Sequence, residues 1–289
     1  MSLLARSDGA TLRDVTRASR PIDERFSRPA VMGVLNVTPD SFSDGGRFMA
    51  PADAIAHGRR LAAEGAALVD VGGESTRPGA EAVTVEEELR RVEPVLEGLA
   101  GIPVSIDTSK AAVARRALEL GAEMVNDVTA LRGDPEMASV VAEGDAFLCL
   151  MHMQGEPRTM QAAPHYDDVV AEVKEYLRGR IEAAEWAGIR PQALAIDPGI
   201  GFGKNLEHNL ALIRHLDALA DLGRPILVGP SRKRFIGAIL DLPEGERVEG
   251  TAGAVAWLVG RGAHIVRVHD VRQIVRVVRV VDAIVRAEA

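Results

Sequence analysis

A regular alternation of short apolar segments and longer amphipathic segments is the feature of this 289-residue chain that most limits its fold. Each apolar segment has the length and composition of a buried strand, and the segments between them have helical spacing. The expected strands are Val31–Leu35, Leu68–Val71, Val104–Ile106, Met124–Val125, Phe147–Met151, Leu194–Ile196, Ile226–Val228 and Ile265–Val268. Eight strands with crossover helices predict a single (β/α)₈ barrel of the α/β class, although the pattern alone also allows an open doubly wound sheet.

The segments between these strands set the expected domain organisation. The expected helices cover residues 52–64, 86–99, 110–120, 169–187, 205–222, 251–259 and 271–285. Residues 1–27 are polar and are expected to form a leader with little structure, ahead of a barrel domain over 28–289. The βα connections after the first, second and fifth strands (36–51, 72–85 and 151–166) exceed the usual length of about 2–6 residues, and their Gly, Pro and Ser content suggests mobile lids.

Composition excludes several classes of protein. The net charge of −8 argues against nucleic acid as the main partner. The single cysteine, Cys149, excludes an internal disulfide and lies in an apolar run, as a buried bystander would. We see no secretory signal and no apolar stretch near the ~20 residues that span a bilayer, so we expect a cytoplasmic protein.

The segment Asp197-Pro-Gly-Ile-Gly-Phe-Gly-Lys204 places a carboxylate at a strand exit, followed by three glycines and a lysine. Strand exits face the ligand-binding mouth of α/β folds, and glycines let the backbone approach a ligand closely. Neither the nucleotide phosphate loop nor the dinucleotide fingerprint fits this spacing. The alternative is a flexible turn with a helix-capping aspartate.

Polar residues gather at or beyond the carboxyl ends of the expected strands. They are Asn36, the segment 72–77, Asp107, Asn126, His152, Asp197, Lys233 and His269. In a barrel all these ends open on one face, the face that carries active sites. This arrangement favours the barrel over the open sheet.

Asp107, Asn126 and Asp197 would form an acceptor-rich wall at that mouth, opposite the amino group of Lys233. Such a wall suits a flat heterocycle with adjacent N–H donors, such as an aminopyrimidinone edge. The alternatives are a structural Asp–Lys ion pair, two helix-capping aspartates, or metal ligation by the two carboxylates.

The last expected strand ends Arg267-Val-His269-Asp270, just before a helix. Arg267 and His269 point to the same side of a strand, and orphan N–H groups at a helix start add to their charge. This predicts an anion site, with a capping Asp270 and a surface arginine as the alternative.

The order and spacing of these motifs over about residues 30–285 closely resemble the dihydropteroate synthase family. The resemblance rests on segments 32–46, 70–79, 105–110, 126–128, 151–154, 197–204, 231–233 and 267–270. It implies a pterin-binding (β/α)₈ barrel, usually a homodimer and the target of sulfonamides. The family joins p-aminobenzoate to 6-hydroxymethyl-7,8-dihydropterin diphosphate in folate biosynthesis, releasing pyrophosphate and 7,8-dihydropteroate.

The resemblance also implies roles for matching residues. Pterin binding is implied for Asp107, Asn126, Asp197 and Lys233, diphosphate binding for Thr76, Arg267 and His269, and ligation of Mg²⁺ for Asn36. The p-aminobenzoate site and its lids would involve Asp40, Phe42, Arg77, Pro78, Phe202, Ser231 and Arg234. For both phenylalanines, ordinary lid packing is the alternative.

One position departs from many relatives. In those relatives a serine follows the motif lysine and helps to hold the benzoate carboxylate. This chain has Arg234 at that position, which puts the hydroxyl contact in doubt.

The competing functions are a methyltetrahydrofolate:corrinoid methyltransferase, which needs no diphosphate site, and a non-catalytic pterin-binding subunit. Release of pyrophosphate distinguishes the synthase from both.

Overall fold

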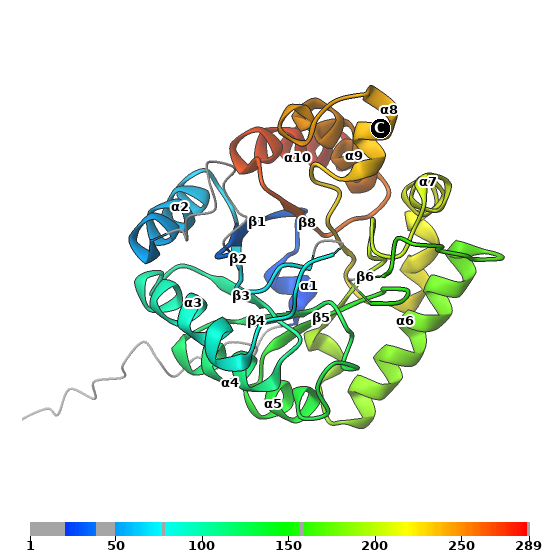
Figure 1. Ribbon diagram of the computed structural model, residues 1–289. Helices are drawn as coiled ribbons and strands as arrows, with labels where there is room; N and C mark the ends of the chain where they lie inside the picture. The colour runs from blue at the N-terminus through cyan, green and yellow to red at the C-terminus, as the bar shows by residue number, and fades with distance from the viewer. Residues whose placement is uncertain (1–20, 39–49, 77–78, 157–158, 288–289) are drawn as a thin grey trace, which may run out of the picture.

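The computed structural model describes residues 21–38, 50–76, 79–156 and 159–287, and within them eight parallel strands form the barrel (Figure 1). The strands are β1 (Ala30–Asn36), β2 (Leu68–Gly72), β3 (Val104–Asp107), β4 (Met124–Asp127), β5 (Phe147–Met151), β6 (Leu194–Asp197), β7 (Leu227–Val228) and β8 (Ile265–Val268). Their order in the sheet is β6-β5-β4-β3-β2-β1-β8-β7. A parallel bridge between Ile196 and Ile226 links β6 to β7 and brings the two edges together, so the (β/α)₈ prediction is confirmed and the open sheet is excluded.

Helices surround the strands on the outside of the barrel (Figure 1). They are α2 (Pro51–Ala63), α3 (Val85–Gly98), α4 (Ala111–Leu120), α5 (Met137–Glu143), α6 (Val169–Trp186), α7 (Leu206–Arg214), α8 (Arg234–Leu240), α9 (Val248–Gly260) and α10 (Val271–Val285). Short 3₁₀ helices lie at η2 (Pro191–Ala193), η3 (Leu216–Leu222) and η4 (Glu244–Glu246).

Local side-chain contacts fix where the main helices begin. The Thr84 side chain accepts from the backbone N–H of Glu87 at the start of α3, and Asp168 accepts from two backbone N–H groups at the start of α6. Asn205 and His208 form a reciprocal capping box at the start of α7. These contacts satisfy backbone donors that the first turn of a helix leaves without partners.

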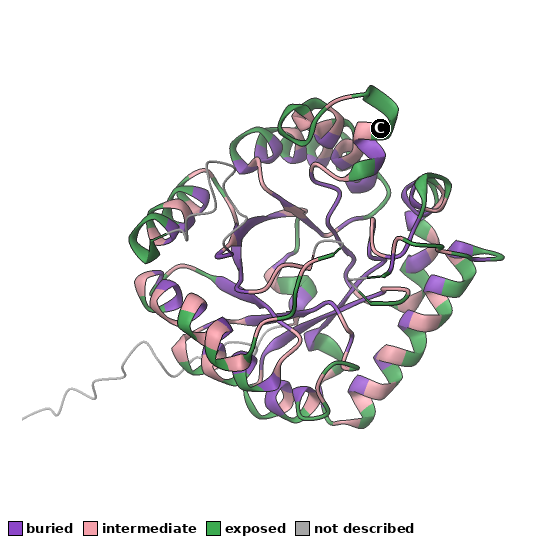
Figure 2. Ribbon diagram, viewed as in Figure 1, coloured by how far each residue is buried: buried purple, intermediate pink, exposed green. Residues whose placement is uncertain are grey.

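The core lies in and around the barrel wall. Figure 2 shows the strands buried along most of their length, and the helices buried on the side that faces them. A parallel sheet covered on both faces is apolar along whole strands, which explains why the sequence shows these strands as continuous apolar runs.

One expected helix is divided in the structure. Residues 205–222 form α7 followed by the 3₁₀ helix η3, rather than one α-helix. Leu216 and Leu219 are both buried, and their three-residue spacing matches the repeat of a 3₁₀ helix. Both residues belong to the hydrophobic core, so this segment stays packed although its helix type changes.

The end of the expected leader packs against the barrel. Residues Ile22–Arg25 form the short helix α1, and Ile22 and Phe26 are buried in the core. Arg25 Nη2 lies 3.0 Å from Glu123 Oε1, next to the start of β4, so α1 covers the amino-terminal end of the barrel, opposite the mouth. The domain boundary after residue 27 stays a prediction.

The long connections follow β1, β2 and β5, as expected, over residues 37–50, 73–84 and 152–168. Across the part of the chain that the structure describes, no helix is long and apolar enough to cross a membrane.

Candidate functional site at the barrel mouth

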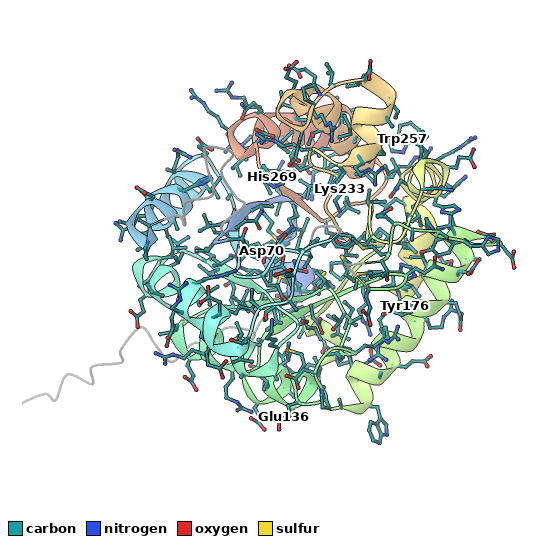
Figure 3. The ribbon with its side chains drawn as sticks, in the orientation of Figure 1. Asp70, Glu136, Tyr176, Lys233, Trp257 and His269 are labelled. Atoms are coloured by element: carbon teal, nitrogen blue, oxygen red, sulfur yellow. The ribbon has the colours of Figure 1, made fainter. Side chains whose placement is uncertain are left out.

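Polar side chains from most of the strands meet at the carboxyl end of the barrel. Asp70 (β2), Asp107 (β3), Asn126 (β4) and Asp197 (β6) are all buried, in an interior otherwise made mainly of apolar side chains. Figure 3 places Asp70 near the barrel axis, with Lys233 and His269 at the ends of the later strands. Carboxyl ends of parallel strands lie together, so residues far apart in the sequence meet at one site.

Arg267 connects two of these carboxylates. Its Nε donates a hydrogen bond of 2.6 Å to Asp70 Oδ2, and its Nη2 donates one of 2.7 Å to Asp107 Oδ2. Asn126 Nδ2 donates to the same Asp70 oxygen at 3.1 Å. Asp70 therefore holds both Arg267 and Asn126 in place.

Burial and charge shape the ionisation of this cluster. Burial raises the pKa of Asp107 to about 7, although the guanidinium of Arg267 opposes that shift. Burial disfavours the charged form of Arg267, but Asp70 and Asp107 outweigh that effect and raise its pKa above the ordinary value. One cation shared by two buried carboxylates leaves the site with spare acceptor capacity for a ligand that carries N–H donors.

Asp197 and Lys233 form a second pair of oppositely charged groups at the same mouth. Asp197 Oδ1 accepts from the backbone N–H of Gly199 at 2.7 Å, which turns the chain directly after β6. Burial lowers the pKa of Lys233 to about 8 against the opposing attraction of Asp197, and burial raises the pKa of Asp197. Lys233 Nζ donates to the carbonyl of Ile200 and lies 4.5 Å above the centre of the Phe202 ring.

The segment Gly199–Gly203, here called the glycine loop, requires its glycines. Gly199 has a φ of +66°, and a Cβ there would overlap the carbonyl oxygen of His152. Gly203 has a φ of +60°, and a Cβ there would overlap the carbonyl oxygen of Gln154. Left-handed backbone and close approach to the β5–α6 connection together exclude other residues at these two positions.

Ser231 and His269 meet beside the last strand. Ser231 Oγ lies 3.0 Å from His269 Nδ1 and accepts from the His269 backbone N–H at 3.2 Å. The Asp270 carboxylate pairs with Arg232 through two hydrogen bonds, and its side chain makes no capping bond to α10. The alternative of a capping Asp270 is therefore wrong.

The structure tests how a metal would be held. Within the described residues there is no group of three or more His, Cys, Asp or Glu side chains that could hold a metal ion. Asn36, at the end of β1, lies opposite Gly72 in register, and its amide oxygen and the Asp107 carboxylate both approach that glycine. One amide oxygen fits a hard cation that brings its other ligands from a diphosphate and water, as Mg²⁺ commonly does.

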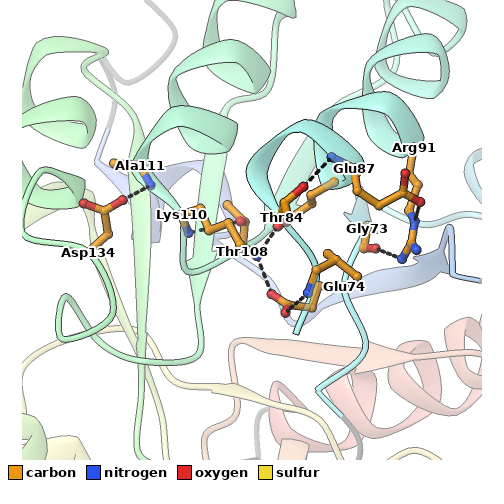
Figure 4. Close-up of polar contacts among 11 residues, drawn as sticks. Gly73, Glu74, Thr84, Glu87, Arg91, Thr108, Lys110, Ala111 and Asp134 are labelled. Carbon is orange, nitrogen blue, oxygen red and sulfur yellow. Dashed lines mark hydrogen bonds and ion pairs between the residues drawn. The ribbon is translucent and has the colours of Figure 1, made fainter. Parts of the chain in front are cut away.

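A second polar network fixes the start of the connection after β2 (Figure 4). Lys110 Nζ lies 2.6 Å from Glu74 Oε2 and 2.6 Å from Glu88 Oε2, and Glu88 is fully buried. Glu74 Oε1 accepts from the backbone N–H of Val83, and Arg91 donates to the Gly73 carbonyl. This network ties the two ends of the connection to α3 and α4.

The structure brings together most, but not all, of the residues expected from the sequence. Asp107, Asn126, Asp197, Lys233, Arg267 and Phe202 converge, His269 and Ser231 lie beside them, and Asn36 lies at the adjoining strand end. Thr76 is half-buried in the connection after β2, and Arg234 is exposed at the start of α8. Asp40, Phe42, Arg77 and Pro78 lie outside the described residues.

The helix-capping alternatives for the two aspartates are also wrong. Asp197 contacts Gly199, and the start of α7 is capped by Asn205. Asp107 pairs with Arg267, and the first backbone N–H of α4 donates to Asp134.

Sequence reasoning missed two buried residues of this site. Asp70 lies within an apolar strand, and a carboxylate in such a run was a signal that it faces the barrel interior. Lys204 ends the glycine segment, is only 3% exposed, and donates to the carbonyls of Gly199 and Phe202. A lysine that closes a glycine-rich turn was the signal there.

Comparison with known proteins agrees with this geometry. A family model described as pterin binding enzyme matches residues 32–269. The dihydropteroate synthase of Escherichia coli (strain K12) is 48% identical over 266 residues, which cover 91% of this chain and 94% of that protein.

Two crystal structures extend the likeness to three dimensions. The Yersinia pestis dihydropteroate synthase with a sulfonamide drug complex has a TM-score of 0.87 and 45% identity, covering 91% of this chain and 96% of that one. The Xanthomonas albilineans dihydropteroate synthase with 4-aminobenzoic acid has a TM-score of 0.85 and 51% identity, covering 91% and 95%.

The fold, the buried acceptor wall and the matched family model define a barrel enzyme of the pterin-binding class. Sequence identity of this extent over nine-tenths of both chains identifies the family within that class. The chain belongs to the dihydropteroate synthase family.

Proposed function

We infer that the chain is a dihydropteroate synthase. It transfers the pterinylmethyl group of 6-hydroxymethyl-7,8-dihydropterin diphosphate to p-aminobenzoate, and it releases pyrophosphate and 7,8-dihydropteroate in folate biosynthesis. The observation that carries this conclusion is the buried acceptor wall of Asp107, Asn126 and Asp197, with the Lys233 amino group near enough for Asp197 to influence its pKa. The reaction is also that of the named relatives.

The wall is proposed to bind the pterin. Asp107 and Asp197 present carboxylate oxygens to the ring N–H groups, and Asn126 supplies an amide that can both donate and accept. Lys233 donates to the acceptor atoms of the ring once it leaves the Ile200 carbonyl. Support comes from their burial at one mouth, where hydrogen bonds are strong and unpaired polar groups are unfavourable.

The diphosphate is proposed to lie on the β8 side of the pocket. His269 and Ser231 offer donors beside the start of α10, and Thr76 offers a hydroxyl on the connection after β2. Arg267 contributes positive charge there while its carboxylate contacts hold it in place. Mg²⁺ ligated by Asn36 would neutralise charge on the departing pyrophosphate.

The p-aminobenzoate ring is proposed to pack on Phe202 of the glycine loop. The two long connections after β1 and β2, with Asp40, Phe42, Arg77 and Pro78, would cover it. Its carboxylate would meet the start of α8, where Ser231 and Arg234 lie. Arg234 replaces the usual serine hydroxyl with a cation at that point.

The chemistry follows from leaving-group stabilisation. Arg267 and His269 stabilise charge that develops on the pyrophosphate, and the neighbouring carboxylate of Asp107 favours positive charge on the pterin methylene. An aromatic amine is a weak neutral nucleophile, so the pocket contributes mainly by positioning it. Covering connections would keep water away from the electrophilic carbon.

The proposal includes a homodimer in the cytoplasm. Exposed apolar side chains on neighbouring helices support self-association: Ile239 and Leu240 on α8, at 56% and 43% exposure, and Trp257 on α9, at 46%. Sedimentation of the wild-type chain and of Leu240→Glu tests it, with a dimer expected only for the former.

Direct detection of the product tests the function. Purified protein given dihydropterin diphosphate, p-aminobenzoate and Mg²⁺ is expected to form 7,8-dihydropteroate, identified by mass spectrometry. Lys233→Ala should lose at least about 100-fold in kcat/KM, because the ring loses the Lys233 amino group as a hydrogen-bond donor. Methyl transfer from methyltetrahydrofolate without dihydropteroate formation would instead point to the methyltransferase alternative.

A further inference from the structure

Five consecutive carbonyl groups in the glycine loop accept hydrogen bonds from side chains. Lys204 Nζ donates to Gly199 at 3.0 Å and to Phe202 at 2.9 Å, and Lys233 Nζ donates to Ile200. Gln161 Nε2 donates to Gly201 at 2.5 Å, and the Tyr166 hydroxyl donates to Gly203 at 2.9 Å. A loop rich in glycine loses more conformational entropy than others on ordering, and these contacts help to offset that loss, together with the hydrogen bond from the Gly201 N–H to Asn209 Oδ1.

Lys204 holds two of these carbonyls and is the most buried of the donors. It is 3% exposed, and its third contact is His152 Nδ1 at 2.9 Å, on the connection after β5. Burial lowers the pKa of Lys204 to about 7, and burial followed by the Lys204 charge lowers the pKa of His152 to about 3. Nδ1 of neutral His152 accepts from an ammonium or donates to a neutral amine, so the contact survives either state.

The loop in turn sets two parts of the pocket. Its Ile200 carbonyl holds Lys233, and a Cβ at Gly201 would lie only 2.9 Å from Lys233 Cδ. Its Phe202 ring lies under the Lys233 amino group. Displacement of the loop would therefore move the Phe202 ring. Asp107 and Asn126 are fixed on strands of the barrel, and in the proposed function Lys233 leaves the Ile200 carbonyl to bind the pterin, so pterin binding depends less on the position of the loop.

We propose that Lys204 is a positioning residue of the benzoate subsite: it fixes the glycine loop so that Phe202 presents its ring to p-aminobenzoate. This inference rests on the proposed function. Lys204 itself reaches neither substrate, because its amino group is enclosed by the loop and His152.

Lys204→Met, which keeps the length of the side chain and removes its donors, tests the inference. We expect KM for p-aminobenzoate to rise about 10-fold, with KM for dihydropterin diphosphate and kcat within about threefold of wild type. In hydrogen exchange followed by mass spectrometry, amides of residues 199–204 should exchange about 10-fold faster, without a matching change in the strands. Lys174→Met, at an exposed pair with Asp221, is the matched control and should alter neither.

Tyr166→Phe keeps the inference testable if Lys204→Met does not fold, since it removes one donor to the same loop. We expect a smaller rise in KM for p-aminobenzoate, about threefold, with Tyr176→Phe as its control. An unchanged KM for p-aminobenzoate in both variants, or equal rises for both substrates with unchanged exchange at 199–204, would overturn the inference. Absence of product from the wild-type chain would count against the proposed function instead, and exchange would still decide whether Lys204 fixes the loop.

Discussion

Arg267 and Asp70 lie 197 positions apart in the chain, yet Arg267 Nε donates a 2.6 Å hydrogen bond to Asp70 Oδ2 inside the barrel. Because Asn126 shares that oxygen, one fully buried carboxylate organises an arginine and an amide that both face the pocket. Asp70 is therefore as important to the site as the residues proposed to touch substrate.

Replacing Asp70 with asparagine should both destabilise the protein and impair the reaction. We expect a loss of about 2 kcal/mol in the free energy of unfolding, less than for a fully broken buried pair because Asp107 still faces Arg267. The value of kcat/KM for dihydropterin diphosphate should fall about 10-fold or more. Urea denaturation and steady-state kinetics measure the two effects. Asp217→Asn, at an exposed pair with Arg261, should change neither, and equal behaviour of the two variants would contradict this role.

The dependence of stability on pH should show the raised pKa of Asp107. Burial raises this pKa from 3.8 to about 7, so the folded state binds a proton more tightly than the unfolded state. The stabilisation of the fold that comes from protonated Asp107 is fully present below pH 3.8, and it is lost as the pH rises to about 7. Relative to Asp107→Asn, the wild-type free energy of unfolding should fall across that interval. Parallel curves for the two proteins would show that Asp107 does not titrate there.

Lys110 is expected to stabilise the folded state through its contact with Glu88. Lys110→Met leaves the fully buried Glu88 without its cation, which is expected to cost about 3 kcal/mol of unfolding free energy. Lys110→Met combined with Glu88→Gln should recover part of that loss, because the buried charge is then removed. Denaturation midpoints compare the variants, and Arg115→Met, at an exposed pair with Glu143, provides the control. A double variant less stable than the single one would argue against the explanation.

Substitutions at Gly199 and Gly223 distinguish the free-energy cost of a left-handed backbone from the cost of a steric overlap. Gly199 and Gly223 have nearly the same φ, +66° and +63°, but only at Gly199 does a Cβ meet other atoms. Gly223→Ala should therefore lose about 1 kcal/mol through its left-handed conformation alone. Gly199→Ala adds overlap with the His152 carbonyl and should lose at least about 3 kcal/mol. Thermal unfolding of both variants measures the difference, and similar losses would mean that the loop adjusts freely.

The barrel could be predicted from the sequence to within a residue or two at most strand ends. Strands covered on both faces are apolar throughout, and those runs were visible. The carboxyl ends of the strands were harder to predict, because Asn36, Asp107 and Asp127 belong to strands although they are polar. The pocket wall was predictable for the same reason, since polar residues directly after apolar runs meet at one mouth.

The contacts within the pocket could not be predicted. Nothing near Arg267 in the sequence indicates that its partners are Asp70 and Asp107, because those contacts depend on closure of the barrel. Glu88 occurs among the charged residues of a surface helix, and only the packing of α3 against α4 buries it beside Lys110. Lys204 was visible as a motif residue, but its three acceptors come from the folded loop and His152.

Release of pyrophosphate tests the central claim most directly. Purified protein with dihydropterin diphosphate and Mg²⁺ should release pyrophosphate only when p-aminobenzoate is also present, and Lys233→Ala should abolish the release. Folded protein that binds a pterin but releases no pyrophosphate in response to p-aminobenzoate would contradict the assignment as a synthase.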